Sequence, residues 1–223
     1  MDRADTMGDG QVRIVCLGLP DRSDLASRVA ESSNLIGSEV EFAIELGQGE
    51  DVDQGSIDWR GSLSSANWLV VSSSCALGEK GIRGAWGASL AFSELEGSKT
   101  AMVVEVPSDS ARMNEAWGAV IERIRQIGVL YLTNEAMVAI SKIEKTESRE
   151  LLDEIRKKGM VPLVCSFNPG DGVAEVSHPL GGGFFNVEGR FGEERWLAGF
   201  LWRLSTTGHG PSGIEFAARS ENP

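Results

Sequence analysis

Two apolar runs, Ala101-Met-Val-Val-Glu-Val106 and Val129-Leu-Tyr-Leu-Thr133, decide the fold of this chain. Pro107 ends the first run, and Asn134-Glu-Ala-Met137 follows the second directly. Between them, apolar residues recur at helical spacing from about residue 110 to 127. The stretch therefore predicts a strand, an amphipathic helix and a second strand, which is the repeating unit of a parallel sheet covered by helices.

The same alternation continues on both sides of this unit. Further strands are expected near residues 12–17, 40–44, 68–72 and 161–167, and helices near 24–32, 88–95, 134–142, 148–158 and 193–204. We predict an α/β fold with a mostly parallel, Rossmann-like sheet that carries helices on both faces. Residues 11–167 would form the nucleotide-binding-like domain, and 168–204 a C-terminal extension packed on it. Residues 1–10 and 205–223 are expected to be flexible tails, and the glycine-rich segment 178–192 is expected to consist of turns.

Composition narrows the function. The chain has 33 acidic and 21 basic residues and a net charge of -12, which argues against nucleic acid as a partner. Three cysteines without regular spacing predict free thiols in a reducing cytoplasm, and only two histidines argue against a metal site. No segment approaches the roughly 20 apolar residues of a membrane span. We expect a cytoplasmic protein.

Asn134 is the first candidate site residue, because groups just past the carboxyl end of a parallel strand line the ligand crevice. Its amide can donate to and accept from a nucleotide base, but Asn is also a favoured helix cap. The second candidate is the loop containing Gly78, Gly81 and Gly84, since glycine lets backbone N–H groups approach a phosphate. Lys80 and Arg83 in this loop would supply positive charge, or would be ordinary surface charges.

The segment from Trp68 to Lys142 resembles the GTPase domain of the tubulin/FtsZ superfamily. The resemblance is carried by the strand that ends at Pro107, by Arg112-Met113 followed by Ala116, and by the strand that ends in Asn134-Glu-Ala-Met137. It implies that Asn134 contacts a guanine, and that Gly18, Gly78, Gly81 and Gly84 lie near the phosphates. It also implies GTP or GDP as the ligand, and a filament-forming relative or a second copy of the chain as the partner.

The chain departs from that family at its phosphate loops. Gly18-Leu-Pro-Asp21 keeps one glycine, while Pro20 lacks an N–H and Asp21 would repel phosphate. The resemblance then implies a non-hydrolysing or weakly GTP-binding accessory protein of the cytoskeleton or of cell division. No catalytic residue is identified, and GTPase activity is doubtful.

Two other functions fit the same residues. The first is a Rossmann-like enzyme that acts on a small phosphorylated metabolite and uses Ser72, Lys80 or Arg83 as polar groups. The second is an interaction domain without a ligand, which would present Trp59, Trp86 or the Phe184-Phe185 pair to a partner.

Overall fold

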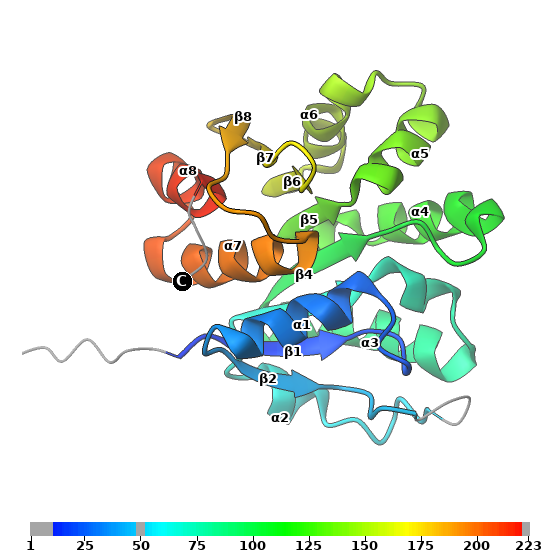
Figure 1. The fold of residues 1–223 in the computed structure, drawn as a ribbon. Helices are drawn as coiled ribbons and strands as arrows, with labels where there is room; N and C mark the ends of the chain where they lie inside the picture. The colour runs from blue at the N-terminus through cyan, green and yellow to red at the C-terminus, as the bar shows by residue number, and fades with distance from the viewer. Residues whose placement is uncertain (1–10, 48–51, 220–223) are drawn as a thin grey trace, which may run out of the picture.

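An eight-stranded sheet runs through the molecule in the order β2-β1-β3-β4-β5-β6-β7-β8 (Figure 1). The computed structural model describes residues 11–47 and 52–219. The first six strands in this order are parallel, whereas β6, β7 and β8 pair antiparallel. The strands are β1 Arg13–Leu17, β2 Glu39–Phe42, β3 Trp68–Ser72, β4 Lys99–Val104, β5 Val129–Leu132, β6 Leu163–Asn168, β7 Val173–His178 and β8 Gly181–Asn186.

Helices cover both faces of this sheet. One face carries α1 Leu25–Leu35, α7 Glu193–Thr207 and α8 Pro211–Arg219. The other carries α2 Trp59–Leu63, α3 Lys80–Glu96, α4 Met113–Glu122, α5 Asn134–Glu144 and α6 Ser148–Gly159. Three short 3-10 helices, η1 Ser73–Leu77, η2 Ser110–Arg112 and η3 Ile124–Gln126, lie in the connections.

Alternation along the strands divides the core into two layers. On β5, Leu130 and Leu132 pack under α3–α6, while Val129 and Tyr131 pack under α1, α7 and α8. Because both faces are covered, the central strands are buried along nearly their whole length and read as continuous apolar runs. The predicted fold class, a mostly parallel sheet flanked by helices on both faces, is confirmed.

The strand order places a topological switch point beside β1. The chain goes from β1 to β2 on one side, and then returns to β3 on the other side of β1. The connections at this point leave the sheet in opposite directions, because α1 lies on one face and α3 on the other. Open α/β sheets bind ligands at the carboxyl ends of the strands at such a point. The loops that follow β1 and β3 are therefore the natural place to look for a ligand.

The C-terminal region differs from the sequence-based expectation. The segment expected to form turns at 178–192 contributes the hairpin strand β8, and helix α8 occupies much of the expected tail. Ile214 and Ala217 of α8 are buried against the sheet layer that α7 covers. Consecutive glycines in β8 hid the strand signal, because glycine is depleted in strands. The remaining parts of the expected tails, residues 1–10 and 220–223, lie outside the described residues.

The glycine-rich segment after β3 is mainly helical. Helix α3 begins at Lys80, so Gly81 and Gly84 lie inside its first turns. A Cβ atom at Gly81 would stand 2.0 Å from the carbonyl oxygen of Val52, and one at Gly84 would stand 2.7 Å from Oε1 of Gln54. These two glycines therefore allow the segment around Val52 to pack closely on α3.

Candidate functional site

Glu105 stands at the switch point, one residue beyond the end of β4. Its carboxylate accepts hydrogen bonds from the backbone N–H of Leu25, at 3.2 and 3.1 Å, and from the Ser72 hydroxyl at 3.2 Å. Burial, and next the negative charge of Asp24, raise the pKa of Glu105 to about 7. Its side chain is partly accessible rather than sealed in the core. Near neutral pH, Glu105 can therefore either accept or donate a proton at this edge of the sheet.

Asp24 is the N-cap residue of α1. Its carboxylate accepts from the N–H and hydroxyl of Ser27, at 3.0 and 2.8 Å, and from the N–H of Leu19 at 2.7 Å. Gly18 makes this approach possible, because a Cβ there would stand 2.0 Å from Ser27 Oγ and 2.6 Å from Asp24 Oδ2. Asp24 and Glu105 together occupy the N-terminus of α1, where an anionic ligand would otherwise bind.

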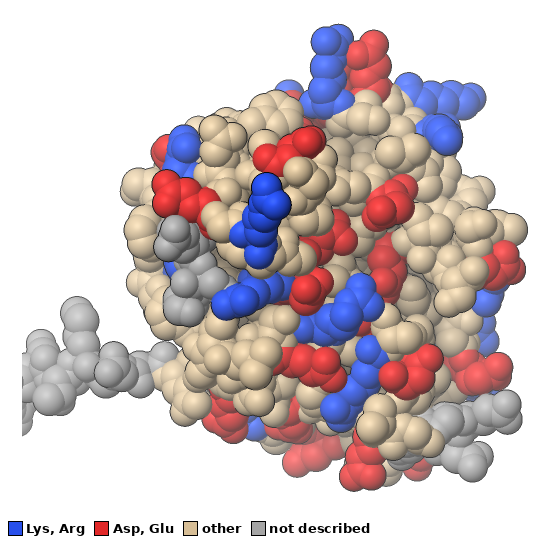
Figure 2. All heavy atoms as spheres, in the orientation of Figure 1, with Lys and Arg blue, Asp and Glu red and all other residues tan. Residues whose placement is uncertain are grey.

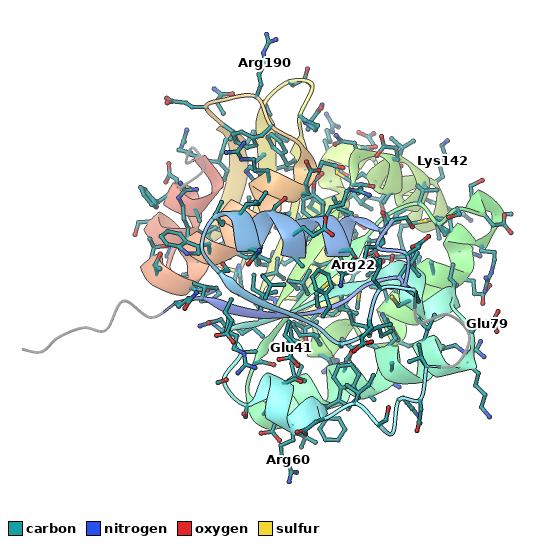
Figure 3. The ribbon with its side chains drawn as sticks, turned by 60° about the horizontal axis from the view of Figure 1, so that its bottom comes forward. Arg22, Glu41, Arg60, Glu79, Lys142 and Arg190 are labelled. Atoms are coloured by element: carbon teal, nitrogen blue, oxygen red, sulfur yellow. The ribbon has the colours of Figure 1, made fainter. Side chains whose placement is uncertain are left out.

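Arg22 contributes a cation to the loop that leads to Asp24. It has a left-handed backbone with φ of 54°, and its guanidinium lies 3.8 Å from the centre of the Phe42 ring. Figure 3 labels Arg22. Lys145 and Met160 share that conformation but end helices, whereas Arg22 lies in the loop between β1 and α1. Its buried Nε has no hydrogen-bond partner among the described residues. A strained backbone and an unpaired side-chain donor in one residue are typical of a ligand site.

Ser73 is a second unpaired group at this edge of the sheet. It follows β3 directly, is buried, and its hydroxyl has no partner in the part of the chain that the structure describes. We call Arg22, Asp24, Ser72, Ser73 and Glu105 the switch-point cluster. The cluster combines two acids, two hydroxyls and one cation, which suits a ligand rich in hydroxyl groups.

The N-terminus of α7 is also occupied by acids of the chain itself. Glu193 accepts a hydrogen bond from the Tyr131 hydroxyl at 3.1 Å, and burial raises the pKa of its carboxyl. A Cβ at the cap residue Gly192 would stand 2.2 Å from Oε1 of Glu194, so this carboxylate lies directly over the cap. Arg190 in the preceding loop points away from the sheet into solvent (Figure 3). The N-termini of α1 and α7 therefore both hold carboxylates.

A pocket of about 290 Å³ lies farther along the same edge, beyond β5 and β6. Its polar lining residues are Asn134, Ser166, Asn168, Asp171 and Glu175. The cap of α5 is Thr133, whose hydroxyl accepts from the N–H of Ala136 at 3.1 Å, so Asn134 is not the cap residue. Asn134 instead donates to the carbonyl oxygen of Phe167 at 3.4 Å. A ligand contact by Asn134 stays a prediction.

The other predicted site residues lie apart from these groups. Gly18 belongs to the switch-point turn, whereas Gly78 ends η1 and Gly81 and Gly84 lie within α3. The prediction missed Glu105, Arg22 and Glu175. Glu105 carried a readable signal, because a single acid at the end of a buried strand indicates a site.

Both candidate tryptophans and all three thiols are buried. Trp59 and Trp86 are buried, whereas Phe184 is 65 % exposed. The three cysteines are free and buried, and burial raises their pKa values.

No cluster of three or more potential metal ligands occurs among residues 11–47 and 52–219. Acidic and basic side chains are interspersed over the face that α1 and α7 form (Figure 2). None of the described helices is long and apolar enough to cross a bilayer.

Comparison with solved structures identifies the fold. A fructokinase from Xylella fastidiosa with bound ATP superposes with a TM-score of 0.70 at 10 % identity, over 87 % of this chain and 80 % of that one. A 2-dehydro-3-deoxygluconokinase from Thermotoga maritima gives 0.68 at 13 % identity, over 93 % and 91 %. A Vibrio cholerae fructokinase bound to fructose, ADP and calcium gives 0.66 at 15 % identity, over 94 % and 90 %. No protein-family profile and no curated protein sequence matches the chain. The chain has the fold of sugar kinases.

This fold corrects four expectations. The resemblance to tubulin and FtsZ is wrong, and so are the cytoskeletal and cell-division roles attached to it. GTP or GDP as the ligand is also wrong, since the structural neighbours bind ATP or ADP. The filament-forming partner that the resemblance implied is wrong as well. The pattern of strand, helix, strand and Asn misled because many open α/β sheets share it.

Proposed function

We propose that this protein binds a small, hydroxyl-rich metabolite of the carbohydrate class at the carboxyl edge of its sheet. The observation that carries the proposal is Glu105, a largely buried carboxyl with a pKa of about 7 at the switch point. Proteins of the same fold include fructokinases and a 2-dehydro-3-deoxygluconokinase. The proposed ligand belongs to the small-metabolite alternative that the sequence left open, except that it need not carry a phosphate.

Each group of the switch-point cluster has a role in this proposal. A sugar hydroxyl both donates and accepts, so it pairs equally well with Glu105, with Ser73 or with the guanidinium of Arg22. The unpaired Arg22 Nε and Ser73 Oγ would gain the partners that they lack. Asp24 holds the α1 turn, and its charge adds to the effect of burial in raising the pKa of Glu105.

The N-termini of α1 and α7 do not fit the phosphates of a nucleotide. Phosphate binds at a free helix N-terminus, but Asp24 and Glu105 occupy that of α1, and Glu194 covers that of α7. Additional negative charge would be repelled at close range. We therefore derive no phosphoryl-transfer step, and the proposed activity is carbohydrate binding.

A second candidate is an ATP-dependent sugar kinase. It is favoured by the neighbours with bound ATP or ADP and by Arg22, a cation placed at the switch point. In that case Glu105 would take the proton from the attacking hydroxyl, for which a pKa near neutrality is suited.

Calorimetric titration tests the proposal. Monosaccharides, polyols and sugar acids, with fructose among them, are titrated to tens of millimolar into the wild type, Glu105→Gln and the exposed control Glu122→Gln. We expect saturable binding of at least one compound, weakened in Glu105→Gln and unchanged in the control. The proposal fails if no compound binds. Transfer of labelled phosphate from ATP to a compound that binds would establish the kinase instead.

A further inference from the structure

A row of side chains crosses β6, β7 and β8 on the face away from α7 and α8. Ser166 on β6 stands opposite Glu175 on β7, and Glu175 stands opposite Phe184 on β8. Directly opposed residues on neighbouring strands point to the same side of a sheet. The intervening residues Ala174, Val176 and Phe185 are buried in the other layer, with α7 and α8. The row therefore faces the side on which α5 and α6 lie.

Two hollows lie next to each other along this row. The pocket of about 290 Å³ beyond β5 and β6 includes all three residues of the row. A neighbouring hollow of about 340 Å³, which is also lined by Arg156 and His178, shares Glu175 and Phe184 with it. We call the two adjacent hollows the β7 groove. Each is close to the lower end of the size range of small-molecule sites.

A glycine lets β8 run close to β7 beside the groove. Gly182 stands opposite Ser177, in the next position along the strand from Phe184 on the same face. It has a φ of 152°, and a Cβ there would stand 2.4 Å from the carbonyl oxygen of Val176. A side chain is thus excluded at this point by the backbone of β7.

Among the described residues, the row contains an unpaired hydroxyl, a carboxyl with a raised pKa and an exposed ring. Ser166 is 3 % exposed, and its hydroxyl has no hydrogen-bond partner among the described residues. Burial raises the pKa of Glu175 to about 7. Phe184 exposes 65 % of its surface at the wall of the groove. A buried unpaired hydroxyl and an exposed ring in one groove indicate that a ligand completes it.

The charges around the groove favour a neutral ligand. Asp153, Asp171 and Glu175 line it. The nearby cation Arg156 is already bonded to Asp153 at 3.0 Å and to Ser177 Oγ at 3.1 Å. A phosphorylated or carboxylated ligand would meet mainly acids there. Hydroxyl groups, in contrast, can satisfy Ser166, Glu175 and the amide of Asn134.

We propose that the β7 groove is a second carbohydrate site, in which a neutral sugar ring stacks on Phe184 and bonds Glu175 and Ser166 through its hydroxyls. The inference rests on the proposed function for the ligand class only. Its location is separate, because the switch-point cluster lies at β1, β3 and β4, whereas the groove lies at β6, β7 and β8.

The test is a titration of the full-length, ¹⁵N-labelled protein with fructose, ribose and glucose, followed by NMR. We expect saturable shifts of the amide signals of Ser166, Glu175 and residues 182–184. Phe184→Ala should weaken binding at the groove by about tenfold, the value of one stacked ring. Ser166→Ala should weaken it less. The matched control is Leu180→Ala, which removes an apolar residue that is 73 % exposed outside the groove.

The result separates the two sites. Sugar-dependent shifts confined to Gly18, Ser72 and Glu105, with no effect of Phe184→Ala, overturn the groove and leave the proposed function standing. Shifts confined to the groove and unchanged in Glu105→Gln support the groove and count against the switch-point cluster. Saturable shifts with adenosine but with no sugar assign the groove to a nucleobase and overturn the inference. The absence of shifts at the groove with every compound also overturns it.

Discussion

Replacing Glu105 with Gln should remove a specific part of the pH dependence of stability. The folded carboxyl has a pKa of about 7, against an ordinary value of 4.5, because it is buried beside Asp24. Between these values the folded state keeps a proton that the unfolded state has released. The contribution is therefore complete below pH 4.5 and is lost as the pH rises through 7.

The expected magnitude follows from the two pKa values. A tenfold change in an equilibrium constant corresponds to about 1.4 kcal/mol, so the whole contribution is about 3 kcal/mol. About 2 kcal/mol of it falls between pH 5.5 and pH 8. Relative to Glu105→Gln, the wild type should lose that additional amount over this range.

Urea unfolding of both proteins at half-unit pH steps measures the difference directly. Other titrating groups, including Glu175, are the same in the two proteins and cancel to first order. Glu122→Gln, a change at an exposed position, should give a curve parallel to the wild type. If the wild type and Glu105→Gln give parallel curves, Glu105 titrates near its ordinary pKa, and its assignment as a group poised at neutrality is refuted.

Three further predictions test other parts of the structure. Gly81→Ala should destabilise the fold by roughly 1–3 kcal/mol in urea unfolding, because its Cβ would meet the carbonyl oxygen of Val52. Gly118→Ala, in open space on α4, should instead stabilise it by about 0.5–1 kcal/mol, and equal effects would contradict the close packing at α3. Ile214→Ala should cost about 2–4 kcal/mol, since Ile214 is 3 % exposed; no change in the midpoint of unfolding would show that α8 does not dock. The buried thiols of Cys16, Cys75 and Cys165 should react with a thiol reagent only on unfolding, and rapid reaction of the native protein would show that they are accessible.

The elements that could be read from the sequence are those with strong periodicity. Runs such as Ala101 to Val106 are buried on both sides and bounded by turn residues, so the parallel strands and their helices were predictable. The strand at Gly181 to Gly183 could not be predicted from its residue types. It is stabilised by its hydrogen bonds to β7 and by the packing of α8, and not by the strand preference of its side chains. Helix α8 is short, and its burial against β7 and β8 depends on contacts that local sequence does not show.

The candidate site was less predictable than the fold. Glycines after β3 indicated a phosphate loop, but in three dimensions two of them make room for the segment around Val52. Asn134 does reach a pocket at the edge of the sheet, together with Ser166 and Asn168. Glu105, Arg22 and Ser73 come from three separate loops, and only the strand order brings those loops to one edge. The raised pKa of Glu105 and the unpaired atoms of Arg22 and Ser73 depend on burial, which cannot be read from a sequence.

The central claim is that the carboxyl edge binds a carbohydrate and that its own acids keep out nucleotide phosphates. The most direct measurement is a calorimetric titration of a sugar that binds, performed with and without millimolar Mg-ATP. We predict saturable sugar binding with the same Kd in both titrations, because no nucleotide occupies the site. A Kd that changes about tenfold with Mg-ATP would show linked nucleotide binding and contradict the claim, as would the absence of sugar binding.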